Sequence, residues 1–212
     1  GAASGLLSDL RRGVSILTQL LVGLSILGAA PGFASADDDL PYLQGESQKC
    51  DAPAMLLKRP HDAWQFVDLV KMRLKAEAAG EDTKGYATLR FRLWLGAKRA
   101  DVFVWAWVDS ETREEPLTTE AFAVFKVNQL KAAFVEPKLK KPTLVKFGKR
   151  PGVLITLEGT LAEGSKKPHA ILSAVCIRPE DKVIAVIQLE CDPKYSKALK
   201  KDFLKLLKHL RF

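Results

Sequence analysis

The chain of 212 residues has few of the residue types that usually mark catalytic or metal sites. It contains only three histidines and three cysteines, and their spacings match no zinc site, such as His-x-x-x-His. No serine lies in a Gly-x-Ser-x-Gly elbow, and no glycine-rich stretch has the spacing of a phosphate-binding loop. The acidic turn at 109–115 lacks the residue order of a calcium loop. The sequence therefore predicts no catalytic residue, no metal site and no cofactor, and we expect a protein that is not an enzyme.

The longest uncharged apolar run lies near the N-terminus, at residues 14–30. It follows Arg11 and Arg12 and precedes a small-x-small pair, Ala34 and Ala36, which is the pattern of a secretory signal. As a helix its 17 residues would span about 25 Å, which is shorter than the roughly 30 Å hydrocarbon core of a bilayer. We therefore expect a signal peptide at 1–36 that is cleaved after Ala36, and a periplasmic or extracellular protein. The alternative is a membrane anchor formed by residues 14–30.

Acidic residues are outnumbered by basic ones, 25 to 33, which gives a formal net charge of +8. Such an excess attracts anionic surfaces. Six basic residues gather within a short stretch: Lys138, Lys140, Lys141, Lys146, Lys149 and Arg150. We expect them to form a basic face that engages an anionic membrane surface, an anionic polymer or an acidic envelope protein, since nucleic acid is a poor partner for an exported protein. The alternative is a solvated surface that only keeps the protein soluble.

The three cysteines allow at most one disulfide within the chain, and export would permit it. Cys176 and Cys191 flank a predicted hairpin around 178–182, in which Cys176 would lie opposite Ala185 and too far from Cys191 to bond. Cys50 and Cys191 both lie just outside predicted strands, so we expect these two to pair. Cys176 is then expected to be a small, buried apolar residue.

Hydrophobic periodicity predicts the order of the secondary-structure elements. Strands are expected at 54–60, 86–95, 102–108, 143–148, 152–161, 169–177 and 183–191. Helices are expected at 117–134, capped by Thr118 or Thr119 and stopped by Pro137, and at 192–212, capped by Asp192. Residues 64–78 fit either a helix or a strand. We therefore expect an α+β fold, a mainly antiparallel sheet with helices packed on its faces, in one domain at 50–212 that follows a flexible leader at 37–49.

The most aromatic run, VFVWAWV at 102–108, could be an exposed stacking platform or the centre of the sheet. Both of its alternating faces are apolar, and no basic residue stands among its aromatics, as a nucleic-acid platform would require. We expect a central strand that the two predicted helices cover on both sides. The last helix has one apolar face and one lysine face, and we expect it to cover the sheet rather than lie on a membrane.

Three stretches resemble the PsbP-like family, which includes lumenal extrinsic proteins of photosystem II, DcrB-like bacterial lipoproteins and a eukaryotic Ran-binding factor. LKRPHDAWQF at 57–66 resembles the opening strand-Pro-x-x-x-Trp element, although Arg59 stands where family members often have an aromatic residue. FGKRPGVLITLEGTL at 147–161 is similar to a Pro-Gly turn that leads into a long strand, and residues 192–212 resemble the closing helix. Over about 50–212, the resemblance implies an α-β-α sandwich and a non-enzymatic binding or assembly domain.

These observations favour an exported, non-enzymatic binding or accessory domain of the cell envelope that contacts its partner through a basic face. Two alternatives stay open. One is an exported hydrolase whose active-site residues are dispersed along the chain, because a site assembled by the fold leaves no local motif. The other is a membrane-anchored structural protein.

Overall fold

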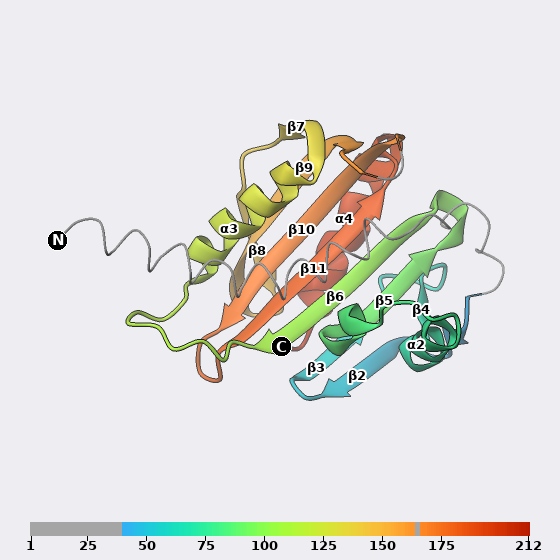
Figure 1. Ribbon diagram of the computed structural model, residues 1–212, viewed down its shortest axis with the longest axis horizontal. Coiled ribbons are helices and arrows are strands. Elements are labelled where there is room, and N and C mark those ends of the chain that lie inside the picture. The colour runs from blue at the N-terminus through green and yellow to red at the C-terminus, as the bar shows by residue number, and fades with distance from the viewer. Residues whose placement is uncertain (1–39, 164–165) are drawn as a thin grey trace.

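The computed structural model describes residues 40–163 and 166–212. The predicted signal peptide, its cleavage site after Ala36 and the anchor alternative at 14–30 lie outside the described residues. Within them, one large antiparallel sheet forms the middle layer, and helices lie on both of its faces (Figure 1). The predicted α+β fold class is confirmed.

The elements have the following bounds. The large sheet contains β1 (Tyr42–Leu43), β4 (Gln65–Val67), β5 (Leu89–Leu95), β6 (Ala100–Val108), β7 (Phe134–Leu139), β8 (Thr143–Phe147), β9 (Arg150–Leu161), β10 (Pro168–Arg178) and β11 (Val183–Cys191). A small sheet pairs β2 (Ser47–Asp51) with β3 (Ala54–Lys58). The helices are α2 (Leu69–Ala78), α3 (Thr119–Ala132) and α4 (Pro193–His209), with short 3-10 turns η2 (Lys84–Ala87) and η3 (Gly96–Lys98). The large sheet has the order β1-β4-β5-β6-β11-β10-β9-β7, and β8 also pairs with β9.

Local capping explains where the helices begin. The Thr118 side chain accepts a hydrogen bond from the backbone N–H of Ala121 at the start of α3, and Asp192 caps α4, whose first residue is Pro193. Both caps agree with the sequence pattern. The ambiguous stretch 64–78 contains both predicted structures, because β4 ends just before Asp68, which caps α2.

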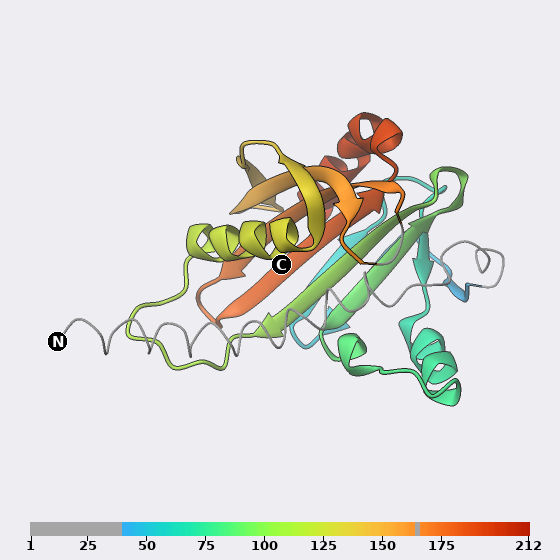
Figure 2. The same ribbon diagram turned by 45° about the horizontal axis from the view of Figure 1, so that its top comes forward.

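Strand β6 lies at the centre of the sheet, between β5 and β11. Val102, Val104 and Ala106 pack in the core cluster that α4 covers, whereas Phe103 and Trp105 pack in the cluster that α3 covers. Figure 2 shows α3 and α4 on opposite sides of the sheet. Residues 102–106 are therefore the buried core that the two apolar faces predicted, and not an exposed stacking platform, whereas Trp107 is half-buried and Val108 is 56% exposed.

The leader and the end of the first predicted long helix differ from the sequence-based expectation. In the stretch expected to be a flexible leader, residues 42–43 pair with β4 and residues 47–51 pair with β3, so the described part from residue 40 belongs to the folded unit. Helix α3 ends at Ala132, before the expected stop at Pro137. Pro137 instead lies within β7, at an irregularity in its pairing with β9, a position where a strand tolerates the missing N–H.

No helix in the described ranges combines the length and apolar character that crossing a bilayer requires.

Candidate functional site

Strands β7 and β8 follow one another along the same side of β9 and together form one edge of the large sheet. Five of the six predicted basic residues have exposed side chains on this edge or its turns: Lys138, Lys140, Lys141, Lys146 and Lys149. We call these five lysines the basic edge. Lys140 Nζ lies 3.8 Å from the Glu158 carboxylate. Among the described residues, the other four have no carboxylate within 4.0 Å.

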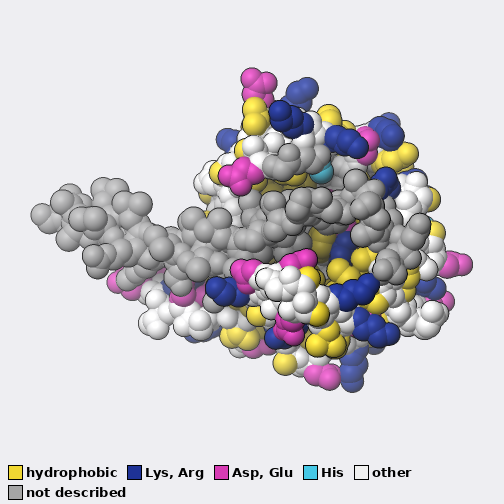
Figure 3. Space-filling model, turned by 45° about the vertical axis from the view of Figure 1, so that its right-hand side comes forward, with side chains coloured by type: hydrophobic (Ala, Val, Ile, Leu, Met, Phe, Trp, Pro, Cys, Tyr) yellow, Lys and Arg dark blue, Asp and Glu magenta, His cyan; other side chains and the backbone are white. Residues whose placement is uncertain are grey.

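The local sequence explains why these side chains face solvent. Lys140, Lys141 and Pro142 connect β7 to β8, and the Lys140 N–H donates to the Thr156 carbonyl of β9, which keeps the connection against the sheet. Lysines and prolines on an edge strand also oppose unspecific edge-to-edge pairing. On the face shown in Figure 3, by contrast, basic and acidic side chains lie interspersed.

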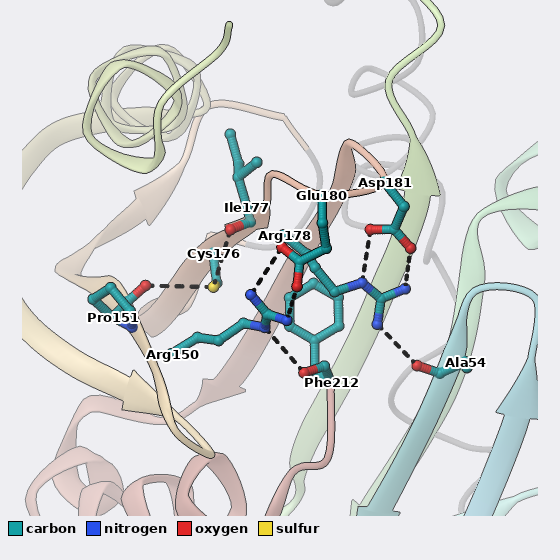
Figure 4. Close-up of polar contacts among 9 residues, drawn as sticks. All are labelled: Ala54, Arg150, Pro151, Cys176, Ile177, Arg178, Glu180, Asp181 and Phe212. Atoms are coloured by element: carbon teal, nitrogen blue, oxygen red, sulfur yellow. Dashed lines mark hydrogen bonds and ion pairs between the residues drawn. The ribbon is translucent and has the colours of Figure 1, made fainter.

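Arg150, the sixth predicted basic residue, has its charge engaged within the fold (Figure 4). Its Nε donates to the Phe212 carbonyl at 3.2 Å, Nη1 donates to Glu180 Oε2 at 3.0 Å, and Nη2 also pairs with Glu180. The hydrogen bond from Arg150 lowers the pKa of Glu180. Arg150 therefore lies beside the basic edge but does not contribute a free cation to it.

A second arginine, Arg178, also contacts Phe212 (Figure 4). Arg178 donates to both Asp181 carboxylate oxygens, at 2.8 and 2.7 Å, and to the Ala54 carbonyl at 3.2 Å. Its guanidinium also lies 4.8 Å from the centre of the Phe212 ring, a cation–π distance. Arg150 and Arg178 thus hold Phe212 between the β10–β11 turn and β3, which is a structural role.

A second set of polar residues lies on the side of the sheet on which α3 packs. Strand pairing puts Arg92, Phe103, Gln188 and Ser173 in one row across the sheet, and Trp94, Asp101 and Glu190 in the next row. Lys126 lies on the buried side of α3, and its charge interacts with that of Glu190. We call Arg92, Asp101, Lys126, Gln188 and Glu190 the polar cluster.

Arg92 and Asp101 form a two-pronged ion pair in this cluster. Arg92 Nε and Nη2 donate to the two carboxylate oxygens at 2.8 and 2.9 Å, and the guanidinium lies 5.3 Å from the centre of the Phe103 ring. Burial alone would lower the pKa of Arg92, but the charge and the hydrogen bonds of Asp101 outweigh it and raise the pKa. Arg92 is therefore a guanidinium cation at all ordinary pH values.

The remaining charged groups of the cluster titrate close to neutral pH. Burial lowers the pKa of Lys126 to about 8, although the Glu190 charge opposes this, and Lys126 Nζ donates to Gln129 Oε1 at 3.1 Å. Burial raises the pKa of Glu190 to about 7, opposed by a 2.9 Å hydrogen bond from Gln188 Nε2. Sequence reasoning missed this cluster, and its only signal was the polar pair Gln188 and Glu190 within the apolar run 183–191.

Several polar atoms near the polar cluster are buried without a hydrogen-bond partner among the described residues: Trp105 Nε1, Gln129 Nε2, Ser173 Oγ and Gln188 Oε1. Such atoms lower stability unless water or a ligand satisfies them.

The histidines do not form a recognisable catalytic arrangement in the described part of the chain. His61 Nε2 lies 2.9 Å from Asp202 Oδ2, and the same oxygen accepts a 3.0 Å hydrogen bond from Nε1 of the buried Trp64. Lys205 Nζ donates to the Pro60 carbonyl at 2.7 Å. These contacts fasten the segment before β4 to α4. Within residues 40–163 and 166–212, no group of three or more His, Cys, Asp or Glu side chains could hold a metal ion.

The three cysteines, Cys50, Cys176 and Cys191, are free thiols. Cys50 lies on β2 beside β3, whose Leu56 pairs with Arg211 just beyond the end of α4, whereas Cys191 directly precedes the start of α4. The 17 residues of α4 span about 25 Å, and the Cα atoms of a disulfide lie within about 7 Å. The expected Cys50–Cys191 disulfide is therefore absent, because the fold puts the two residues near opposite ends of one helix.

Cys176 lies opposite Ala185, as the predicted hairpin requires, and its side chain is fully buried. Burial raises the pKa of Cys176 to about 11 and that of Cys191 to about 12. Both thiols are therefore unreactive apolar groups of the core that α4 covers.

Comparison with known proteins shows the fold. No protein-family model and no curated protein matches the chain. Among solved structures, the Ran-binding protein Mog1p of Saccharomyces cerevisiae is 12% identical with a TM-score of 0.50, over 80% of this chain and 95% of that chain. Cyanobacterial PsbP (CyanoP) of Synechocystis is 10% identical with a TM-score of 0.49, over 82% and 95%. A Pseudomonas aeruginosa protein of unknown function is 15% identical with a TM-score of 0.41, over 56% and 77%.

At these low sequence identities the similarity shows only a shared fold, and this conclusion rests on the comparison with Mog1p. The chain has the α-β-α sandwich fold of Mog1p, which confirms the fold that the three sequence stretches implied.

Proposed function

We propose that the chain is a non-enzymatic binding domain that engages an anionic partner through the basic edge. The observation that carries the proposal is the set of four exposed lysines, Lys138, Lys141, Lys146 and Lys149, which have no carboxylate within 4.0 Å among the described residues. Unpaired charge of one sign on one edge attracts a partner of the opposite sign. The fold neighbour Mog1p is by name a Ran-binding protein, which supports a binding role for this type of domain.

We also propose that the protein acts outside the cytoplasm, in the cell envelope. This part of the proposal rests on the signal pattern of residues 1–36. Mass spectrometry of the protein purified from its own cells would find a mature N-terminus at Asp37. A full-length chain in the membrane fraction would instead favour the anchor at 14–30.

The binding proposal is tested by removing charge from the edge and, as a matched control, from α4. One variant changes the four unpaired edge lysines to Gln. The control changes four exposed lysines of α4 to Gln: Lys197, Lys200, Lys201 and Lys208. Both variants have the same net charge.

The probes are anionic phospholipid vesicles, heparin and polyglutamate, at low and physiological salt. Each lysine near an anionic surface contributes about 1 kcal/mol, so the edge variant should bind at least one probe more than about 100-fold more weakly than the wild type. Equal losses in the two variants would show attraction by net charge alone. Either that result or no binding of any probe at low salt would overturn the proposal.

A further inference from the structure

Among the described residues, strand β8 pairs only with β9, so one of its two edges has no partner strand there. The turn between β8 and β9 contains Gly148 at a φ of +57°. In such a two-residue turn, Phe147 and Arg150 exchange backbone hydrogen bonds, and antiparallel strands alternate between bonded and non-bonded pairs. The N–H and C=O groups of Leu144 and Lys146 therefore point away from β9, and no described residue bonds to them.

The side chains of β8 also divide into two sets. Val145 and Phe147 pack in the core that α4 covers. Leu144 lies on the other face and is 80% exposed, the highest value among the large hydrophobic side chains of the described residues. Strand β7 is protected from further pairing by Pro137 and an irregular register, whereas β8 has neither a proline nor a bulge. Unpaired backbone groups on an edge strand are a template for pairing with another chain, and the exposed leucine offers an apolar contact beside them.

The lysines around β8 indicate the chemical class of the partner. Lys141 precedes the open backbone groups, Lys146 lies among them and Lys149 follows them in the turn. A second copy of this chain would bring the same lysines against each other, because pairing two β8 edges sets like charges opposite, which is destabilising. Lipid headgroups and anionic polymers would use the charges but neither the backbone groups nor Leu144.

We propose that the anionic partner is an extended acidic segment of another protein, which adds to the sheet as a strand beside β8. Its backbone bonds the free groups of Leu144 and Lys146, an apolar side chain covers Leu144, and its carboxylates face the lysines of the basic edge. This inference rests on the proposed function and names the partner class for the same edge.

The first experiment keeps the wild-type protein and changes only the ligand. A labelled peptide of about eight residues, alternating Glu with Val, is compared with the same peptide methylated on every backbone nitrogen. The two have equal charge, but only the first can donate a full set of strand hydrogen bonds. We expect methylation to weaken binding at least about tenfold, and the amides of Leu144 and Lys146 to gain hydrogen-exchange protection with the unmethylated peptide.

The second experiment changes the protein. Leu144→Pro removes the outward N–H while leaving the hydrogen bonds of Val145 to β9 in place, and Leu144→Ala keeps the N–H but shortens the side chain. We expect Leu144→Pro to abolish peptide binding and Leu144→Ala to weaken it less. Circular dichroism verifies that both variants are folded.

The outcomes separate the two proposals. Equal binding of both peptides, with heparin binding retained, would overturn strand addition and leave the anionic-partner proposal standing. Binding of anionic vesicles without any peptide binding would show that the edge serves a membrane surface and would also overturn strand addition. No binding of peptide, heparin or vesicles would overturn both proposals.

Discussion

Replacing Lys126 by Met should stabilise the protein at neutral pH. Lys126 is 4% exposed on the buried side of α3, and burial lowers its pKa from the ordinary 10.5 to about 8. At about 1.4 kcal/mol per pH unit, the charged ammonium destabilises the folded state by about 3 kcal/mol. Met fills a similar volume without charge, but the substitution removes the hydrogen bond to Gln129, which contributes about 1 kcal/mol. The net gain is about 2 kcal/mol, or roughly 4–8 °C in Tm for a domain of this size.

The pH dependence of the free energy of unfolding tests whether the buried charge of Lys126 causes this difference in stability. Because the folded-state pKa is depressed, the unfolded chain binds more protons between pH 8 and about 10.5, and the wild type gains stability as pH rises through this range. The advantage of Lys126→Met, measured by urea unfolding, should therefore shrink to nothing by about pH 10.5. Lys131→Met, at an exposed position of the same helix, should change stability by less than about 0.5 kcal/mol at any pH. A loss of stability in Lys126→Met at pH 7, or a gain that persists at high pH, would refute the reasoning.

Three further predictions concern buried groups. The pKa of Glu190 is raised from 4.5 to about 7, so the folded state binds more protons in this range and wild-type stability should fall as pH rises through it. Glu190→Gln should remove that fall, measured as urea midpoints at pH 5 and 7. Asp202→Ala leaves the buried Trp64 N–H without its acceptor and should cost about 1–3 kcal/mol in urea unfolding followed by tryptophan fluorescence, whereas Asp202→Asn should cost less. Cys176 and Cys191 should react with a thiol reagent only after unfolding, and fast reaction of either in the native protein would contradict their burial.

The sequence alone predicted most elements, because their signals are local. The caps Thr118 and Asp192 satisfy N–H groups within two or three residues of their own positions. The two apolar faces of 102–108 required cover on both sides, wherever the covering helices came from. The lysines of the basic edge could be found because they are close together in the chain.

Other features depend on residues that only the fold brings together. Strand β7 follows from pairing with β9, although Pro137 disfavours a strand, and Arg150 loses its free charge to Glu180, thirty residues away. The polar cluster joins α3 to three strands.

The sequence by itself thus determined the order of helices and strands, the buried central strand and the concentration of lysines between 138 and 149, since hydrophobic period, caps and composition act over a few residues. The tertiary structure alone decided that Cys50 and Cys191 lie too far apart to bond and that no strand of the described ranges pairs with the outer edge of β8. Both depend on strand register and helix length, which bring distant residues together or keep them apart without leaving a local pattern.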